Sequence, residues 1–316
     1  MRGHAGWDEY WAGDRPQSCV PLNPQTAAQL RDLWLARFET LAAGARILDV
    51  ATGNGILLAH AVEVARRRQV DFALTGVDLA AIDPLRHLSH PDPLLRHAQF
   101  IGGVAAERLP FTAAAFEMVV SQYGLEYAQP ARALAEVARV LVPGGRLVWL
   151  AHHEDSDVVI QNAAQQAEVD WLLGAAGPYV AMRGFVRSLA NPQRAARAAS
   201  RLERALRDAE EYCRMRPPAR VVTQVCTEFV AVAQRAAAYR RLDLERMLDD
   251  GEHQLRLHRQ RIVDLRRAVL TGPRRQLVRE ALASRQWQDL RLTEARLAEG
   301  ESPVGLWLEA TRSPSA

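Results

Sequence analysis

Lysine is absent from this chain of 316 residues, because all 40 residues of the Lys+Arg count are arginine. Without an ε-amine the protein cannot form a Schiff base to a carbonyl group or to pyridoxal phosphate. It also has neither the lysine of a Walker-type phosphate loop nor the strand lysine of a protein kinase. The missing lysine therefore excludes three broad classes of enzyme.

Cysteines and long apolar segments are scarce as well. Cys19, Cys213 and Cys226 lie far apart and in no Cys-x-x-Cys spacing, so we expect neither a disulfide framework nor a metal site. No run of about 18 apolar residues occurs, and residues 1–15 hold no apolar segment typical of a secretory signal. We therefore expect a cytoplasmic protein that does not span a membrane.

The charge is distributed unevenly along the chain. Residues 192–286 hold 21 Arg against 12 Asp and Glu, whereas the whole chain has a net charge of only +3. A basic segment attracts nucleic acid or another anionic partner, but arginines on solvated helix faces give the same count. Nucleic acid is disfavoured as a partner, because these arginines form no block of like charge.

Strands and helices alternate in the first half of the chain. Apolar runs predict five strands, at residues 46–50, 72–78, 98–103, 116–122 and 145–153, with helical segments between them. A long helical stretch follows, and residues 287–297 and 304–312 then predict a hairpin at the far edge of the sheet. We predict an α/β fold with a doubly wound, mostly parallel sheet of seven strands and a large helical insertion before the last two strands.

This pattern divides the chain into three parts. They are an N-terminal arm and helix that cap a ligand site (residues 1–42), the sheet domain (43–155 plus 284–316) and the helical insertion (156–283). Residues 1–25 are expected to be irregular, and one long helix is expected between Pro218 and Gly272. The insertion is expected to act as a substrate lid, as a dimerisation element or as a structural brace.

A glycine-rich turn after the first strand is the most informative segment. The sequence ILDVATGNG (47–55) places small residues where a parallel strand ends and a helix begins, which is a common site for a bound nucleotide. Asp78, 23 residues beyond Gly55, is suited to accept the hydroxyls of a ribose. Asp49 would repel a pyrophosphate but attract the ammonium group of an amino acid, so we expect no binding of NAD.

Four further segments extend this pattern: GVDLA (76–80), AAERLPF (105–111), FEMVVSQYGLEY (116–127) and RVLVPGGRLVW (139–149). In this order the five motifs resemble those of class I S-adenosylmethionine-dependent methyltransferases, over roughly residues 43–155. The branch that it resembles includes the quinone-biosynthesis enzymes and many small-molecule methyltransferases. The resemblance implies a Rossmann-like methyltransferase fold and S-adenosylmethionine as the cofactor.

The resemblance also implies roles for individual residues. Asp49, Gly53 and Gly55 would hold the methionine end of the cofactor, Asp78 its ribose, Leu79 one face of the adenine, and Ala106 and Glu107 the adenine edge, with Gln122 near the methionine moiety. Ala51 stands where relatives most often have the first glycine of the turn. Ala105 stands where they often have an aspartate that binds the adenine amine.

Candidate catalytic bases lie after the fourth and fifth strands: Glu126, Tyr127, His152 and His153. Because neighbouring side chains of a strand face opposite ways, only one of the two histidines can point at the ligand. A hydrogen-bonded structural histidine is the alternative for each. Trp7, Tyr10 and Trp11 are expected either to cover the sulfonium group of the cofactor or to pack against the sheet.

The sequence thus predicts a methyltransferase that acts on an oxygen, carbon or nitrogen atom of a small or lipophilic metabolite. The segment Ser121-Gln122-Tyr123-Gly124 lacks the Pro-Pro-aromatic motif of many amide and nucleobase N-methyltransferases, which disfavours that chemistry. Two alternatives stay open: an RNA methyltransferase that uses the basic insertion, and a non-catalytic scaffold that binds the cofactor.

Overall fold

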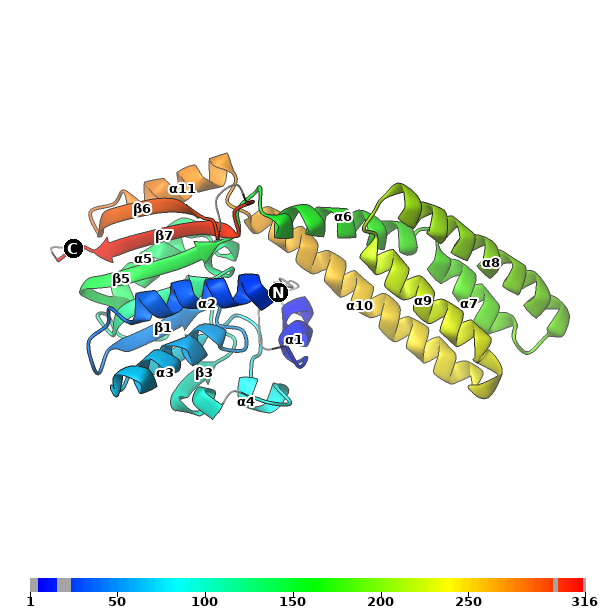
Figure 1. Cartoon of the computed structure of the whole chain (residues 1–316), viewed down its shortest axis with the longest axis horizontal. Helices are drawn as coiled ribbons and strands as arrows, with labels where there is room; N and C mark the ends of the chain where they lie inside the picture. The colour runs from blue at the N-terminus through cyan, green and yellow to red at the C-terminus, as the bar shows by residue number, and fades with distance from the viewer. Residues whose placement is uncertain (1–4, 16–23, 92, 298–300, 315–316) are drawn as a thin grey trace. The chain divides into compact units, whose positions relative to one another are not determined.

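The computed structural model describes residues 5–15, 24–91, 93–297 and 301–314, so Cys19 lies outside the described residues. The chain divides into two compact units (Figure 1). Unit 1 consists of Met1–Ile160 and Asp264–Ala316, and unit 2 consists of Gln161–Val263. In the described part of the chain, no helix is long and apolar enough to cross a membrane.

Unit 1 is built on a sheet of seven strands. They are β1 (Arg46–Val50), β2 (Ala73–Val77), β3 (Ala98–Ile101), β4 (Phe116–Gln122), β5 (Leu141–Ala151), β6 (Trp287–Ala295) and β7 (Gly305–Arg312). Their order is β3-β2-β1-β4-β5-β7-β6, and only β7 runs antiparallel to its neighbours, β5 and β6. The predicted doubly wound, mostly parallel α/β sheet with a hairpin at one edge is confirmed.

Helices cover both faces of this sheet. α2 (Pro24–Phe38) and α3 (Ile56–Arg68) lie on one face, and α5 (Pro130–Val140) and α11 (Gly272–Leu282) lie on the other (Figure 1). Shorter elements join them: α1 (Ala5–Trp11), α4 (Pro84–His87), η1 (Pro93–His97) and η2 (Leu125–Tyr127).

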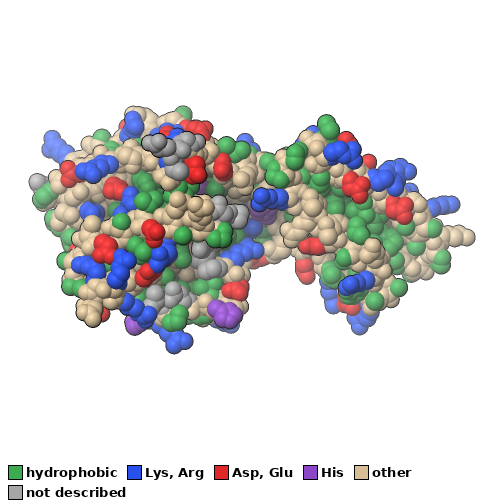
Figure 2. Space-filling view, viewed as in Figure 1, with side chains coloured by type: hydrophobic (Ala, Val, Ile, Leu, Met, Phe, Trp, Pro, Cys, Tyr) green, Lys and Arg blue, Asp and Glu red, His purple; other side chains and the backbone are tan. Residues whose placement is uncertain are grey.

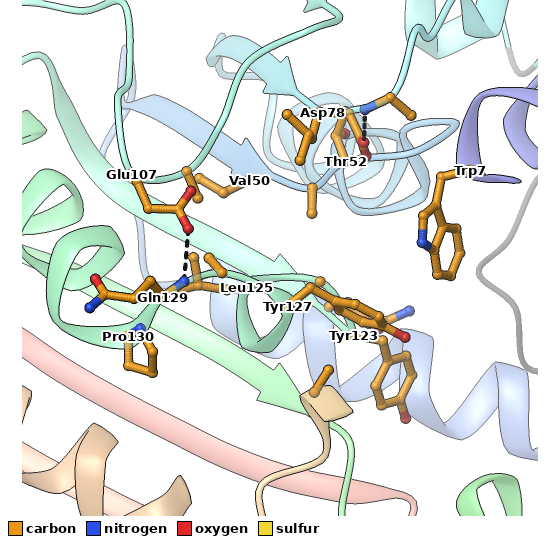
Figure 3. Close-up of a pocket in the computed structure, with 18 of the residues that line it drawn as sticks. Trp7, Val50, Thr52, Asp78, Glu107, Tyr123, Leu125, Tyr127, Gln129 and Pro130 are labelled. Carbon is orange, nitrogen blue, oxygen red and sulfur yellow. Dashed lines mark hydrogen bonds between the residues drawn. The ribbon is translucent and has the colours of Figure 1, made fainter. Parts of the chain in front are cut away.

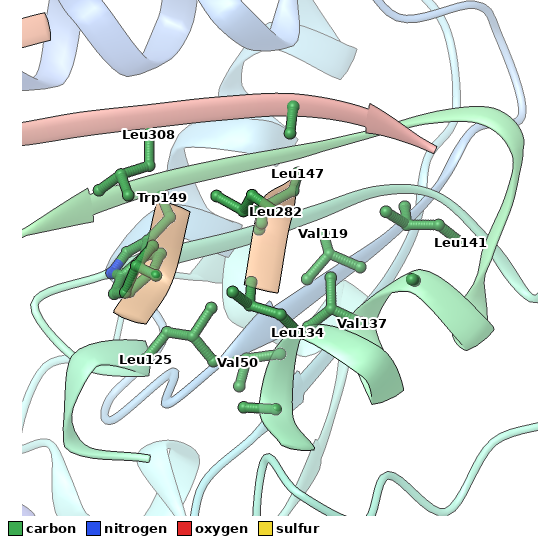
Figure 4. Close-up of a cluster of buried hydrophobic side chains, with 14 of the residues drawn as sticks. Val50, Val119, Leu125, Leu134, Val137, Leu141, Leu147, Trp149, Leu282 and Leu308 are labelled. Carbon is green, nitrogen blue, oxygen red and sulfur yellow. The ribbon is translucent and has the colours of Figure 1, made fainter. Parts of the chain in front are cut away.

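Side chains of the central strands alternate between the two faces, as the period of two requires. In β4, Val119 packs against α5, whereas Met118 and Val120 pack against α2 and α3. Figure 4 shows the α5 face, where Leu134, Val137 and Leu282 meet side chains of β1, β4, β5 and β7. Because these strands are buried on both faces, their sequences contain nearly continuous apolar runs.

Two boundaries of unit 1 differ from the sequence predictions. The N-terminal arm, expected to be irregular, contains the helix α1 (Ala5–Trp11). The chain re-enters unit 1 at Asp264 rather than at residue 284. The reason is that Val278 and Leu282 of α11 are buried in the core against α5, so this helix belongs to the sheet unit and not to the insertion.

Unit 2 is a bundle of antiparallel helices. It contains most of α6 (Asp157–Leu172), then α7 (Pro178–Ser188), α8 (Pro192–Met215), α9 (Arg220–Gln234), η3 (Ala236–Ala238) and most of α10 (Arg241–Ala268). Their apolar faces form a core of their own, which includes Leu172, Met182, Leu202, Val222 and Leu248. Glu168 accepts hydrogen bonds from the amides of Val221 and Val222 at 2.8 and 3.0 Å, which satisfies the first turn of α9.

The single long helix expected between Pro218 and Gly272 is wrong. The chain breaks after Gln234, forms the short η3 helix and starts α10 at Arg241, while Gly272 begins α11. No glycine or proline marks the break, so helical periodicity could not predict it. Gly251 within α10 has a packing reason, because a Cβ there would lie 2.7 Å from the hydroxyl of Tyr179 on α7.

Candidate active site

A cavity of about 1020 Å³ lies at the carboxyl ends of β1, β2 and β4. All residues that line it belong to unit 1. Its wall consists of the loops after these three strands, α1, the start of α5, the end of α10 and part of α11 (Figure 3). Single-ligand pockets usually occupy ~300–1,000 Å³, so this cavity lies at the upper end of that range.

The turn from β1 to α3 has a backbone that few side chains tolerate. Ala51, Gly53 and Gly55 have φ angles of 60°, 52° and 83°. A Cβ at Gly53 would lie 2.5 Å from the ring of Trp11, and one at Gly55 would lie 2.7 Å from the ring of Phe100. Of these three residues, only Ala51 has a side chain at a positive φ angle. Its methyl group fits because the residue opposite is Gly124. A Cβ at Gly124 would lie 2.3 Å from the Cβ of Ala51.

Asp49 ends β1 as a buried carboxylate in the cavity wall. Its Oδ2 accepts a hydrogen bond of 2.7 Å from the Thr52 hydroxyl, whereas its buried Oδ1 has no partner among the described residues. Burial raises the pKa of Asp49 to about 8, and the nearby Asp78 adds to this effect while the Thr52 bond opposes it. At neutral pH the carboxyl group without ligand is therefore mostly protonated, and a cationic donor beside Oδ1 would favour its ionised, accepting form.

Asp78 follows β2 and is fixed by the backbone. The amides of Gly53 and Ala80 donate to its two carboxylate oxygens at 2.9 and 2.8 Å. Burial raises the pKa of Asp78, and these amide bonds oppose the rise. Each oxygen still has accepting capacity, because a carboxylate oxygen accepts more than one hydrogen bond.

The structure brings most of the other predicted cofactor residues to the same cavity. Ala51, Leu79, Ala106, Glu107 and Gln122 line it, and Gly53 and Gly55 shape the turn without appearing in the wall. Two of these side chains already have partners. Glu107 accepts a bond from the amide of Gln129 at 2.8 Å (Figure 3), and Gln122 accepts one from the Trp34 indole at 2.6 Å.

Among the four candidate bases, only Tyr127 lines the cavity. Glu126 and His152 form a buried pair behind it: His152 Nδ1 lies 2.7 Å from Glu126 Oε1, and Glu126 also accepts from the Trp149 indole at 3.1 Å. His152 Nε2 has no partner within the described residues. Its ring packs at 4.6 Å from the ring of Tyr123, which also lines the cavity.

His153 is buried and faces away from this pair. Its Nδ1 accepts a hydrogen bond of 3.1 Å from the amide of Asp155, and its Nε2 lies 3.7 Å from Glu294 on β6. The two histidines lie in different environments, but β5 ends at Ala151, so both follow the strand that was expected to include them. Neither ring belongs to the cavity wall.

The helix α1 crosses the cavity and carries aromatic rings into it. Asp8 accepts a bond from the amide of Ala81 at 2.8 Å, and Asn54 donates to the carbonyl of Trp11 at 3.3 Å. The ring of Trp7 meets that of Tyr127 edge-on at 5.5 Å. α1 is therefore attached to the loops after β1 and β2 and packs against the loop after β4 (Figure 3).

Sequence reasoning missed the wall formed by the end of α10 and by α11. Arg274 lines the cavity and donates to the backbone carbonyls of Glu126 at 2.7 Å and Ala268 at 3.2 Å, and Leu277 and Ala281 lie on the same wall. A signal was present, since Thr271-Gly272-Pro273 is a typical helix start. This signal indicates a new helix, but not that the helix packs against the sheet. Across the described residues, no group of three His, Cys, Asp or Glu side chains is arranged to hold a metal ion.

Comparison with known proteins assigns this region. Residues 48–149, which hold the glycine turn, Asp78 and Tyr127, match a family model described as a methyltransferase domain. The chain contains a class I S-adenosylmethionine-dependent methyltransferase domain. The cofactor of this methyltransferase domain is S-adenosylmethionine.

Relatives match only part of this chain. An uncharacterized methyltransferase of Mycobacterium tuberculosis is 35% identical over 118 residues, which are 36% of this chain and 43% of the relative. A demethylmenaquinone methyltransferase of Deinococcus radiodurans is 38% identical over 109 residues, 33% of this chain and 42% of the relative. A solved S-adenosylmethionine-dependent methyltransferase of Mesorhizobium loti aligns with a TM-score of 0.31 and 24% identity, covering 38% of this chain and 52% of that one. The chain spans less than half the length of these two curated relatives.

Proposed function

We propose that unit 1 transfers a methyl group from S-adenosylmethionine to a small lipophilic metabolite in this cavity. The observation that carries the proposal is the unpartnered, buried Oδ1 of Asp49, which has no partner among the described residues. An ammonium group satisfies this atom, whereas the pyrophosphate of NAD would be repelled by it.

The residues present fit the cofactor. Asp49 would bind its ammonium group beside the glycine turn of Ala51, Gly53 and Gly55, and Asp78 would accept its ribose hydroxyls. Leu79, Ala106 and Glu107 would bound the adenine, and Gln122, held by Trp34, would lie beside the methionine moiety. Glu107 would act through its backbone, since its carboxylate caps the amide of Gln129.

The acceptor would occupy the remaining space in the cavity. When bound, S-adenosylmethionine supplies a methyl group on a positively charged sulfur. Trp7, Tyr123 and Tyr127 offer ring faces and edges to a cation or to a planar apolar acceptor, and Leu277 and Ala281 extend the apolar wall. The demethylmenaquinone methyltransferases among the relatives, which match 33% of this chain, support a lipophilic acceptor.

Tyr127 is the candidate base that contacts the acceptor, because it alone of the four lies in the wall. We assign His152 and Glu126 to positioning: the carboxylate fixes the imidazole, which supports the ring of Tyr123. His153, beside Asp155 and Glu294, has no role in the proposed step. The arm of residues 1–42 would cap the cofactor, and the insertion would act as a lid or in dimerisation.

Methyl transfer tests the proposal directly. The full chain is incubated with methyl-labelled S-adenosylmethionine and a panel of hydroxylated aromatic and isoprenoid compounds, and label extracted into organic solvent is counted. We expect transfer to at least one acceptor, a reduced kcat for Tyr127→Phe, and no change for the matched Tyr10→Phe, because Tyr10 does not line the cavity. The Asp78→Ala variant, which lacks the ribose partner, serves as the negative control. The proposal would be contradicted if the natural chain transferred label to every acceptor no faster than this variant.

A further inference from the structure

Two segments of unit 2 are rich in arginine and contain no acidic side chain. No Asp or Glu occurs between Asp170 and Glu203, or between Glu228 and Asp243. The first of these segments contains the turn from α7 to α8, and the second contains the turn from α9 through η3 to α10.

The connectivity of the bundle places both turns at the same end. Short turns join α7 to α8 and α8 to α9, so successive helices run antiparallel and alternate turns lie together. Arg183 in the middle of α7 pairs with Asp249 and Glu252 in the first half of α10 at 2.6 and 2.5 Å, so these two helices lie side by side. Figure 1 shows the two turns at one end of unit 2.

We call this end the basic tip and define it by its exposed side chains: Arg187, Arg194, Arg197, Arg235, Tyr239, Arg240, Arg241 and Leu242. Arg240 and Arg241 pair only along their own helix, with Asp243 and Glu245 at 3.3 Å. The other four arginines make no ion pair within the described residues. Figure 2 shows blue side chains spaced along α8 on the outer edge of unit 2.

Apolar side chains are exposed among these arginines. Tyr239 is 43% exposed and Leu242 is 52% exposed, and both lie at the turn into α10. A tyrosine and an aliphatic side chain surrounded by guanidinium groups are typical of a surface that contacts lipid headgroups and the acyl boundary beneath them. An RNA backbone would attract the arginines, but it offers no apolar layer for Leu242.

We propose that the basic tip docks on the surface of a bilayer that contains anionic phospholipids. Each guanidinium group pairs with headgroup phosphates, for which its planar fork is well suited. Tyr239 and Leu242 enter the headgroup region. The docking is peripheral and is independent of the methyltransferase activity proposed for unit 1.

Vesicle sedimentation with the full chain tests this proposal. Vesicles of phosphatidylcholine alone are compared with vesicles that also contain phosphatidylglycerol. We expect binding only to the anionic vesicles, weakened by salt because exposed charges are screened. Each arginine near an anionic surface contributes about fivefold to partitioning, so Arg194→Gln with Arg197→Gln lowers it about 25-fold. Leu242→Ser lowers it about fivefold even at low salt, because its side chain no longer gains apolar contact.

The matched control is Arg214→Gln with Arg220→Gln, which removes the same charge at the turn from α8 to α9, the opposite end of the bundle. We expect it to bind vesicles like the natural chain, and we expect all variants to keep the melting curve measured by circular dichroism. Equal binding to both kinds of vesicle would overturn the proposal. Equal losses in the tip and control variants, or tighter binding to a single-stranded RNA oligonucleotide than to anionic vesicles, would overturn it as well.

Discussion

Replacement of Asp49 by asparagine is expected to stabilise the ligand-free protein at alkaline pH. Burial raises the pKa of Asp49 to about 8 from its ordinary value of 3.8. The folded state therefore holds a proton that the unfolded state releases, and stability is lost as the pH rises between about 4 and 8. At 1.36 kcal/mol for each pH unit, this shift lowers the free energy of unfolding by at most roughly 6 kcal/mol above pH 8.

Asparagine at this position avoids the cost of burying a charge. Its amide nitrogen takes one of the two carboxylate positions, and leaving it unsatisfied costs about 1–3 kcal/mol. The net gain at pH 8 is therefore expected to be about 2 kcal/mol, or about 5 °C in Tm for a unit of this size. The gain should vanish as the pH falls and reverse below about pH 4, because Asp49 is then protonated in both states and only the cost of the unsatisfied amide remains.

Thermal unfolding of the natural chain and of Asp49→Asn, without ligand and at several pH values from 4 to 9, measures this effect. The same substitution should weaken binding of S-adenosylhomocysteine at least tenfold, because a neutral amide replaces the charged partner of its ammonium group. An Asn variant less stable than the natural chain at pH 8 would refute the reasoning. So would a difference in Tm that does not depend on pH.

Three further predictions concern other parts of unit 1. Gly53→Ala should lower the free energy of unfolding by about 1–3 kcal/mol in chemical denaturation, because its Cβ would clash with the Trp11 ring and its φ is 52°; an unchanged value would show that α1 does not pack there. Glu126→Gln should lower the free energy of unfolding by about 1–3 kcal/mol, because one of the hydrogen bonds from His152 and Trp149 loses its acceptor. An unchanged free energy of unfolding would show that these hydrogen bonds are not formed. A Gly/Ser linker in place of residues 161–263 should leave a unit that binds S-adenosylhomocysteine in calorimetry but transfers no methyl group. Full methyl transfer by this variant would show that the insertion has only a structural role.

The parts of the fold that follow from local periodicity were predictable from the sequence. The run RILDV, the glycine turn and the apolar helix after it predict β1, the turn and α3, because their residues determine their conformation through neighbours close in the chain. Asp49 and Asp78 could be placed together in advance, because parallel strands end at one edge of a sheet. The hairpin of β6 and β7 followed from alternation and from the turn residues between them.

Features that depend on distant packing could not be predicted. α11 looks like the end of the helical insertion in sequence, and only the burial of Val278 and Leu282 against α5 assigns it to the sheet unit. The pairing of Glu126 with His152 joins residues 26 apart, so no local pattern indicates it. The break before α10 contains no glycine or proline, and Ala236 within it is buried in the core of unit 2, so no local signal in the sequence indicates it.

Calorimetric titration with S-adenosylhomocysteine tests the central claim most directly, with NAD as the competing ligand and Asp78→Ala as the variant. We predict that the natural chain binds S-adenosylhomocysteine and releases a proton from Asp49 at neutral pH, whereas it does not bind NAD. Asp78→Ala should bind at least tenfold more weakly, because the ribose hydroxyls lose a charged partner. Binding of NAD as tight as that of S-adenosylhomocysteine, or an unchanged affinity in Asp78→Ala, would contradict the assignment of this cavity to the methyl donor.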